Sequence, residues 1–203
     1  LEMSKYVTMI VMGSRGLGGL SGMVMGSVSA AVVSHAHCPV VVVRGDNPVT
    51  EDTKYGPVVV GVDGSGVSQK AIEYAFAEAS ARECELIAVH TWMDMQIQAS
   101  LAGLSAAQQQ WKIVEEEQNM LLGHRLAGYA ERYPDVQVTR VVTRDRPVRA
   151  LVDAAKGAQL LVVGSHGRGG FKGMLLGSTS RALLQSAPCP MMVVRPDSDA
   201  KAH

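Results

Sequence analysis

One stretch of this 203-residue sequence occurs twice. Residues 13–44 align with residues 164–195 without a gap, at an offset of 164 − 13 = 151 positions, and 17 of the 32 aligned pairs are identical. Chance does not produce such identity, so we expect both stretches to fold into the same local structure. A repeat constrains the fold strongly, because each copy has to bury its apolar face against equivalent neighbours.

The position of the second copy predicts the domain organisation. This copy closes a segment that begins near Lys54, so an equal first unit would begin at 54 − 151 = −97, before the chain starts. We therefore expect the C-terminal remnant of a first domain, a linker, one complete domain and a tail, over residues 1–44, 45–55, 56–196 and 197–203. The alternative is that the first 44 residues are an extension that evolved independently.

Short apolar runs alternate with amphipathic segments in the expected complete domain. Continuous runs rich in valine and leucine favour strands buried on both faces, and cap residues, Pro and Gly mark the helix ends. The expected strands are residues 57–62, 85–91, 136–143, 160–163 and 191–194; the expected helices are residues 69–82, 105–133, 178–186 and one between Pro147 and Gly157. This pattern predicts an α/β fold, a doubly wound five-stranded parallel sheet of Rossmann-like type with the order 3-2-1-4-5, plus a partial strand–helix–strand copy at the N-terminus.

The glycine-rich part of the repeat is expected where such a fold binds ligands. In doubly wound sheets, ligands bind beyond the carboxyl ends of the strands at which the winding direction reverses. Gly164 follows the fourth expected strand and residues 63–66 follow the first, so the two loops should face each other. We expect Gly167, Gly169 and Gly170 to adopt positive φ and to turn their N–H groups inward as an anion site.

The helix after this loop completes the predicted anion site. Gly177 precedes a helix whose N-terminal dipole favours negative charge, and the hydroxyls of Ser178, Thr179 and Ser180 add donors that suit a polyphosphate. The pattern G-x-x-x-x-G-K-[ST] is absent and G-x-G-x-x-G fails at Lys172, which excludes two other phosphate-binding loops. The alternative for these glycines is a surface hairpin that binds nothing.

Together these residues resemble the nucleotide-binding branch of the universal stress protein family. The family motif G-2x-G-9x-G-[ST] is present as Gly164, Gly167, Gly177 and Ser178. The stretches VGVDGS, AVHTW and CPMMVV are similar to the family's first, second and last strands. The resemblance covers residues 54–196, and it covers residues 4–44 as the end of a preceding unit, as in tandem members of the family with the first domain truncated.

The resemblance implies ATP as the ligand, with Mg²⁺ or Mn²⁺ accompanying the nucleotide. It implies ligand contacts from four segments, which are Val62, Asp63 and Gly64, then Thr91, then Val163, Gly164, Ser165, His166, Gly167 and Arg168, and finally Gly177, Ser178, Thr179 and Ser180. The first copy keeps Gly13, Gly16, Gly26, Ser27 and Ser29 without a counterpart of Asp63 or Thr91. We therefore expect it to form half of a phosphate site and no adenine pocket.

The implied function is an ATP-dependent regulatory switch in the stress response. Asp63 is the only acidic residue that the sequence places at the crevice, and this favours slow turnover or none. Two alternatives stay open, namely a slow ATPase or autokinase, and a structural dimerisation module with an empty glycine loop.

Composition excludes several other classes of protein. Lys and Arg together number 19, as do Asp and Glu, so the chain lacks the basic excess that is typical of nucleic-acid binders. No apolar run approaches the ~20 residues that span a bilayer. Three cysteines without a C-x-x-C pair predict a reducing compartment, the cytoplasm.

The last strand of each copy bears on the partners of the protein. Residues 39–43 and 190–194 should each be the last strand of a sheet, and exposed apolar edges favour pairing. With the resemblance, this predicts a homodimer or higher oligomer through the last strands, with exchanged segments as one form.

His35, His37 and Cys38 suggest a metal site, but the equivalent residues of the second copy contain no histidine, so we expect no metal there.

Overall fold

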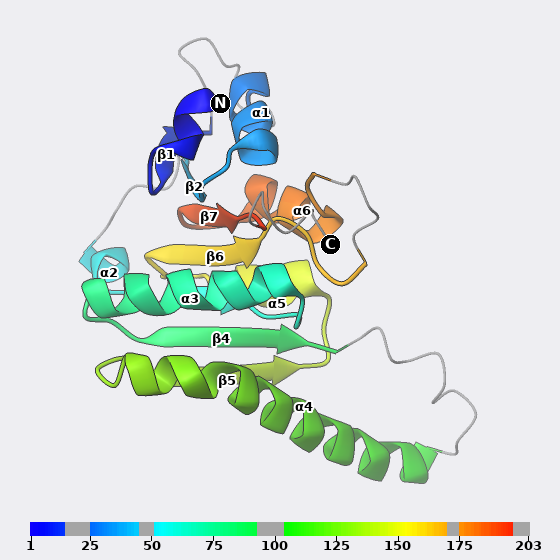
Figure 1. Cartoon of the computed structure of the whole chain (residues 1–203). Coiled ribbons are helices and arrows are strands. Elements are labelled where there is room, and N and C mark those ends of the chain that lie inside the picture. Colours follow the sequence, from blue (N-terminus) through cyan, green and yellow to red (C-terminus); the bar gives the residue numbers. More distant parts are fainter. Residues whose placement is uncertain (15–24, 45–50, 93–103, 170–174, 197–203) are drawn as a thin grey trace, which may run out of the picture.

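A seven-stranded, mostly parallel sheet forms the centre of the computed structural model, which describes residues 1–14, 25–44, 51–92, 104–169 and 175–196 (Figure 1). Its strands are β1 (Ile10–Gly13), β2 (Val40–Val43), β3 (Val58–Gly61), β4 (Leu86–Thr91), β5 (Val138–Thr143), β6 (Leu160–Gly164) and β7 (Met191–Val194). The helices are α1 (Ser27–His35), α2 (Glu51–Lys54), α3 (Gly66–Ala81), α4 (Leu104–Arg132), α5 (Pro147–Ala154) and α6 (Ser178–Ser186), with a 3-10 turn, η1 (Glu2–Lys5), at the start.

The sheet order is β1-β2-β7-β6-β3-β4-β5. Within the segment 56–196 the order is β5-β4-β3-β6-β7, which is 3-2-1-4-5 in chain order, and all of these neighbours are parallel. The predicted α/β fold is therefore confirmed. The sheet has seven strands rather than five, because the two strands of the first copy extend it. Helix α2 lies in the stretch expected to be a linker.

Equivalent hydrogen bonds show that the two copies have the same local structure. The amide of Ser14 donates to the Val43 carbonyl oxygen at 2.8 Å, and Ser165 donates to Val194 at 2.7 Å. The next equivalent bonds are Gly26 N–H to Ser14 O at 2.9 Å and Gly177 N–H to Ser165 O at 2.7 Å. The repeat in the sequence is therefore a repeat of strand, helix and strand.

The two copies meet through their last strands, which run antiparallel. Val40 lies opposite Val193, Val41 opposite Met192 and Val42 opposite Met191. Val41 and Met192 are equivalent residues, since 192 − 41 = 151, so a local pseudo-twofold axis passes through this pair. The prediction that these strands link two chains needs correction, because β2 and β7 already pair with each other within one chain.

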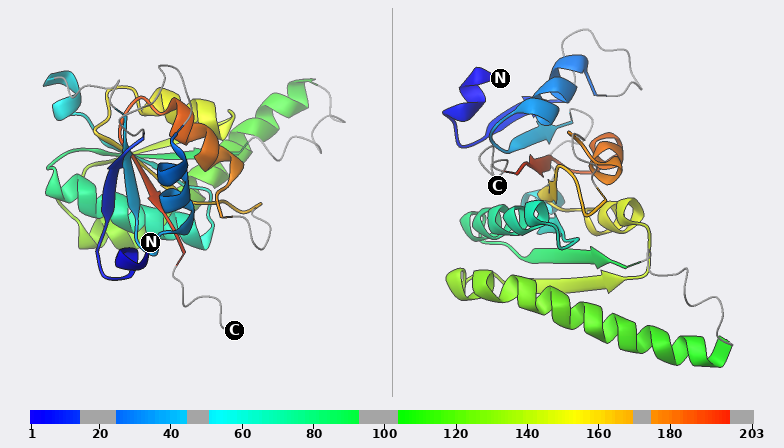
Figure 2. Two further views of the ribbon diagram at one scale, coloured as in Figure 1. Left: turned by 90° about the horizontal axis from the view of Figure 1, so that it is seen from above. Right: turned by 45° about the vertical axis from the view of Figure 1, so that its right-hand side comes forward.

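Side chains alternate between two apolar clusters, one on each face of the sheet. Helices α3 and α4 cover one face, while α1, α5 and α6 cover the other (Figure 2). In α3, Ser65 caps the helix by accepting a 3.1 Å hydrogen bond from Ser68 N–H. The buried residues of α3 follow with helical spacing: Val67, Ser68, Ala71, Ile72, Ala75, Phe76 and Ala79.

The outer edge of the sheet at β1 is incompletely covered. Val11 of β1 is 65% exposed, whereas its counterpart in the second copy, Val162, is fully buried. Val162 packs in the cluster beneath α3, and no helix in the described residues takes the corresponding place over β1. β1 is thus the edge strand of the sheet, and the side chain of Val11 on it is exposed.

Candidate functional site

The glycine loop leaves the sheet where its winding direction reverses. Strands β3 and β6 are parallel neighbours, with Val58 opposite Leu160 and Val60 opposite Val162. The chain continues from β3 into α3 on one face and from β6 towards α6 on the other face. The amide of Arg168 donates to Asp63 Oδ2 at 3.2 Å and joins the two loops, as the sequence predicted.

Close approach, rather than positive φ, explains the glycines of this loop. A Cβ on Gly164 would lie 3.0 Å from Val67 Cγ1, and a Cβ on Gly177 would lie 3.1 Å from the Cα of His166. A Cβ on Gly167 would collide with the carboxylate of Asp63.

The prediction of positive φ in this loop is wrong for Gly167 and Gly169. Among the described glycines only Gly64 (+82°) and Gly157 (+76°) have positive φ. Gly170 lies outside the described residues. The loop therefore needs glycine because neighbouring atoms fill the space of a side chain, and the left-handed turn lies in the facing loop, at Gly64.

The N-terminus of α6 faces this crevice with backbone donors. Gly177 is the N-cap residue and supplies no side-chain cap, so the first amides of α6 lack that partner. Ser178 is exposed and Thr179 is half-buried. Such a helix start combines free N–H groups with the positive end of the helix dipole, which suits an anion.

Ser180 and Ser165 have structural roles. The Ser180 hydroxyl donates to the Gly164 carbonyl oxygen at 2.7 Å, and the equivalent Ser29 donates to Gly13 at 2.9 Å. Ser165 is fully buried, with both its amide and its carbonyl bonded to the backbone. The expected phosphate contact from the Ser180 hydroxyl is therefore replaced by a bond that holds α6 against the end of β6.

We predict that Ser180→Ala lowers the free energy of unfolding by about 1–2 kcal/mol, because the buried Gly164 carbonyl loses its hydroxyl donor. The matched control is Ser186→Ala, which removes an exposed hydroxyl bonded to Ala182 in the same helix and should change stability by less than about 0.5 kcal/mol. Urea unfolding of both variants measures the difference, and equal stability of the two would contradict the assignment.

The Asp63 carboxylate lies between the two loops and is satisfied by donors on both sides. Its Oδ1 accepts from the Ser65 amide at 2.9 Å and from the Ser65 hydroxyl at 2.7 Å, while Oδ2 accepts from the Arg168 amide. Burial alone raises the pKa of Asp63, but these hydrogen bonds, together with one from Ser68, outweigh it and lower the pKa below its ordinary value. Asp63 is thus held as a carboxylate.

We predict that Asp63→Asn destabilises the protein by about 1–2 kcal/mol at pH 7, because the amide cannot accept all of these hydrogen bonds. The lowered folded-state pKa means that the stabilisation is present above the unfolded-state pKa near 4 and is lost as the pH falls through the folded-state value. We therefore expect the difference in free energy of unfolding between wild type and Asp63→Asn to be smaller at pH 3 than at pH 7. The control is Glu116→Gln on the exposed face of α4, whose free energy of unfolding should equal that of the wild type at both pH values.

The remaining predicted residues lie around the same end of the sheet. Val62 is buried, and its carbonyl oxygen is 2.6 Å from Nδ1 of His90. Thr91 ends β4, the neighbour of β3, and lies opposite Thr143 of β5. Val163 is almost fully buried beneath the loop, and His166 Nδ1 is 3.1 Å from the Ser165 hydroxyl.

Arg125 belongs to the site although the sequence analysis did not identify it. A Cβ on Gly64 would collide with the Arg125 guanidinium and would lie 2.6 Å from Arg168 Nη2, so both guanidinium groups converge over Gly64. Burial first, and then the charge of Arg168, lower the pKa of Arg125, while Asp63 opposes this shift. The one feature of the sequence that could have pointed to Arg125 is its place in α4 next to Leu126, which is buried.

The described residues of the crevice form no cluster of metal-ligating side chains. The described residues contain no group of three His, Cys, Asp or Glu side chains arranged to hold a metal ion. Both oxygens of Asp63 already accept hydrogen bonds.

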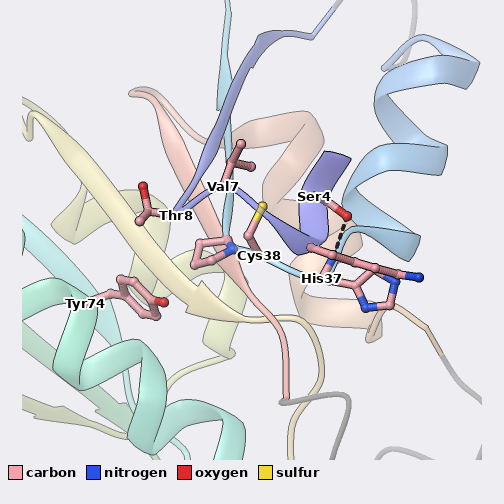
Figure 3. Close-up of a pocket in the computed structure, with 8 residues that line it drawn as sticks. Ser4, Val7, Thr8, His37, Cys38 and Tyr74 are labelled. Atoms are coloured by element: carbon pink, nitrogen blue, oxygen red, sulfur yellow. Dashed lines mark hydrogen bonds between the residues drawn. The ribbon is translucent and has the colours of Figure 1, made fainter. Parts of the chain in front are cut away.

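A separate cavity of about 570 Å³ lies beside the first copy (Figure 3). It is lined by Ser4, Lys5, Val7, Thr8, His37, Cys38, Pro39 and Tyr74. The His37 amide donates to the Ser4 hydroxyl at 2.9 Å on one side of it. None of the residues predicted to bind a nucleotide lines this cavity.

The fold and the crevice define an α/β protein of Rossmann-like architecture with a glycine loop at the reversal point of its sheet. The family model described as the universal stress protein family matches residues 1–44 and 54–195. The chain belongs to the universal stress protein family.

Relatives and solved structures agree with this assignment. A universal stress protein of Mycobacterium tuberculosis is 50% identical over 195 residues, covering 96% of this chain and 64% of the relative, and one of Mycolicibacterium smegmatis is 47% identical over 196 residues, covering 97% and 64%. The crystal structure of a universal stress protein from Archaeoglobus fulgidus superposes with a TM-score of 0.62 at 25% identity, covering 98% of this chain and 64% of that one. The chain thus spans about two thirds of the length of these relatives.

Two observations bear on the surroundings of the protein. In the described part of the chain, no helix combines the length and apolarity that crossing a membrane requires. Cys38, Cys84 and Cys189 are all free thiols, and burial raises the pKa of Cys189 to about 12.

Proposed function

We propose that this protein binds ATP in the crevice between Asp63 and Gly177 and acts as a nucleotide-dependent switch in the stress response. One observation carries the proposal: the family motif Gly164, Gly167, Gly177 and Ser178 lies at the reversal point of the sheet, beside an uncapped helix N-terminus. Crevices at this point of doubly wound sheets are where nucleotides bind.

The chemistry around the crevice supports a specific orientation of the nucleotide. The phosphates would lie against the amides that follow Gly177 and beside the Arg168 side chain, where positive charge gathers. The ribose and base would extend past Gly64 towards Thr91, along the ends of β3 and β4. At Gly64 the guanidinium groups of Arg125 and Arg168 occupy the space that a side chain would fill, so the ligand would meet these two cations there.

The state of Asp63 favours binding over rapid turnover. A general base needs a pKa near the working pH and a free lone pair facing the substrate. Hydrogen bonds lower the pKa of Asp63 and occupy both of its oxygens. A divalent cation would enter together with the nucleotide. In this proposal the protein is cytoplasmic and changes its partners with nucleotide occupancy.

The domain division is part of the same proposal. Residues 56–196 carry the complete sheet order 3-2-1-4-5 and every proposed ATP contact. Residues 1–44 contribute a strand, a helix and a strand that dock antiparallel through β2. We propose that the first copy supports the complete domain and binds no nucleotide by itself.

Titration calorimetry with ATP, combined with a timed incubation with radiolabelled ATP, tests the function. Stoichiometric binding with recovery of unchanged ATP supports the switch. Steady release of phosphate supports the slow ATPase or autokinase instead. If titration shows no binding at millimolar ATP, the result supports a dimerisation module with an empty glycine loop. Sedimentation with and without ATP would then report the oligomeric state of the protein.

A further inference from the structure

The packing of α4 on α3 carries Arg125 to the crevice. The hydroxyl of Tyr129 lies 3.3 Å from the Gln69 carbonyl oxygen, and Arg132 lies 3.4 Å from Glu73, so the two helices run parallel in a regular register. One turn earlier in each helix, Arg125 lies beside the Ser65–Gly64 end of the loop after β3. This register brings the guanidinium over Gly64, where a Cβ would collide with it.

Arg125 is incompletely satisfied in this position. Its Nη1 atom is buried and has no hydrogen-bond partner within the described part of the chain. A buried guanidinium N–H without an acceptor costs free energy, because it has lost water and gained nothing in return. The N–H groups on Nη1 of Arg125 therefore lack an acceptor in the described part of the chain.

The local charge balance points to the nature of that acceptor. Two guanidinium groups, from Arg125 and Arg168, converge over Gly64, and Asp63 is the one carboxylate whose charge acts on Arg125 in the described structure. The Asp63 oxygens are already used by Ser65 and by the Arg168 backbone. Like charges held close together in a partly buried site repel each other unless an anion lies between them.

We propose that Arg125 and Arg168 together bind the phosphate chain of the nucleotide, so that the site selects polyanionic di- and triphosphates over singly charged cyclic nucleotides. This inference rests on the proposed ATP binding and names the ligand charge that the site recognises. Two guanidinium groups present parallel N–H donors that match phosphate oxygens, and charge-assisted bonds of this type are the stronger class.

The first test compares ligands on the wild-type protein. Titration calorimetry with ATP, ADP, cyclic AMP and adenosine should give affinities for ATP and ADP at least about 30-fold above that for cyclic AMP, with adenosine weakest. Equal affinity for ATP and cyclic AMP would overturn the inference while leaving nucleotide binding intact. Absence of ATP binding would instead overturn the proposed function, and the inference with it.

The second test removes the α4 cation. Arg125→Gln should weaken ATP binding by about 10- to 100-fold and leave adenosine binding unchanged, while Arg125→Lys should restore part of the ATP affinity. The matched control is Lys156→Gln, which removes an exposed cation just after the C-terminal end of α5 and should leave the affinities for ATP and adenosine unchanged.

Each result of the second test has a definite meaning. Wild-type ATP affinity in Arg125→Gln overturns the inference, as does an equal loss for ATP and adenosine. Thermal denaturation identifies a variant that fails to fold. If Arg125→Gln does so, Arg125→Lys decides the point, because a side chain that only packs against Gly64 would leave its ATP-to-adenosine ratio at the wild-type value.

Discussion

Replacing Gly56 with alanine is expected to lower the free energy of unfolding by about 3 kcal/mol, the largest effect of any single substitution considered for this protein. Gly56 is buried, and a Cβ there would collide with the Gly157 carbonyl oxygen and lie 3.0 Å from its carbon and 3.3 Å from the Cα of Ala158. All three are backbone atoms, so no side-chain rotation relieves the contact. Chemical denaturation measures the loss.

Hydrogen bonds next to Gly56 explain why the loss of stability should be large. The Gly56 carbonyl oxygen accepts a 2.8 Å hydrogen bond from Gln159 Nε2, and Gln159 N–H donates to Pro57 O at 2.9 Å. These bonds align the start of β3 with the start of β6, the two strands that flank the crevice. A shift of Gly56 therefore disturbs the pairing of β3 with β6.

Gly128 in α4 is the matched control for Gly56. A Cβ at Gly128 meets no atom within 4 Å, so Gly128→Ala should raise stability by about 0.5–1 kcal/mol through its better helix propensity. If Gly56→Ala and Gly128→Ala change stability in the same direction, the steric explanation for Gly56 fails.

The double variant Gly167→Ala/Gly177→Ala is expected to weaken ATP binding by roughly 100-fold, which corresponds to about 2.7 kcal/mol. The first methyl group displaces Asp63 or the loop, and the second crowds His166 at the N-terminus of α6. Both changes move backbone amides away from the phosphates that we propose they bind. Titration calorimetry of the folded variant measures the effect.

Gly26→Ala is the control for this double variant, since Gly26 is the counterpart of Gly177 in the first copy. Its Cβ would have the Ser14 carbonyl oxygen at 3.7 Å as its nearest atom, an ordinary contact. ATP affinity should therefore remain at the wild-type value. Undiminished affinity in the double variant would contradict the proposed role of the glycine loop.

Local patterns made much of the fold predictable. The α6 and β7 bounds agree with the expected residues 178–186 and 191–194, and β6 extends the expected strand by one residue. α3 begins at Gly66, three residues before the expected start at residue 69, and Ser65 caps it. Capping, apolar runs and Pro or Gly positions act within a few residues, so a sequence displays them directly.

The site was predictable in position and less so in detail. The motif spacing placed Gly164, Gly167 and Gly177 at one crevice, yet the reason for glycine at Gly167 is the carboxylate of Asp63, which is 104 positions away. Likewise, the Ser180 hydroxyl is used by Gly164, 16 positions earlier. Contacts of this kind depend on how the loops pack and leave no periodic signal in the chain.

By itself, the sequence determined the repeat, the alternation of strands and helices, the sheet order 3-2-1-4-5 and the edge of the sheet that carries the glycine motif. The tertiary structure alone decided that β2 pairs with β7 inside one chain and that Arg125 reaches over Gly64. The physical reason is one of range: helix caps and apolar periods act between near neighbours, whereas strand pairing and the meeting of two guanidinium groups arise only when distant segments share the same space.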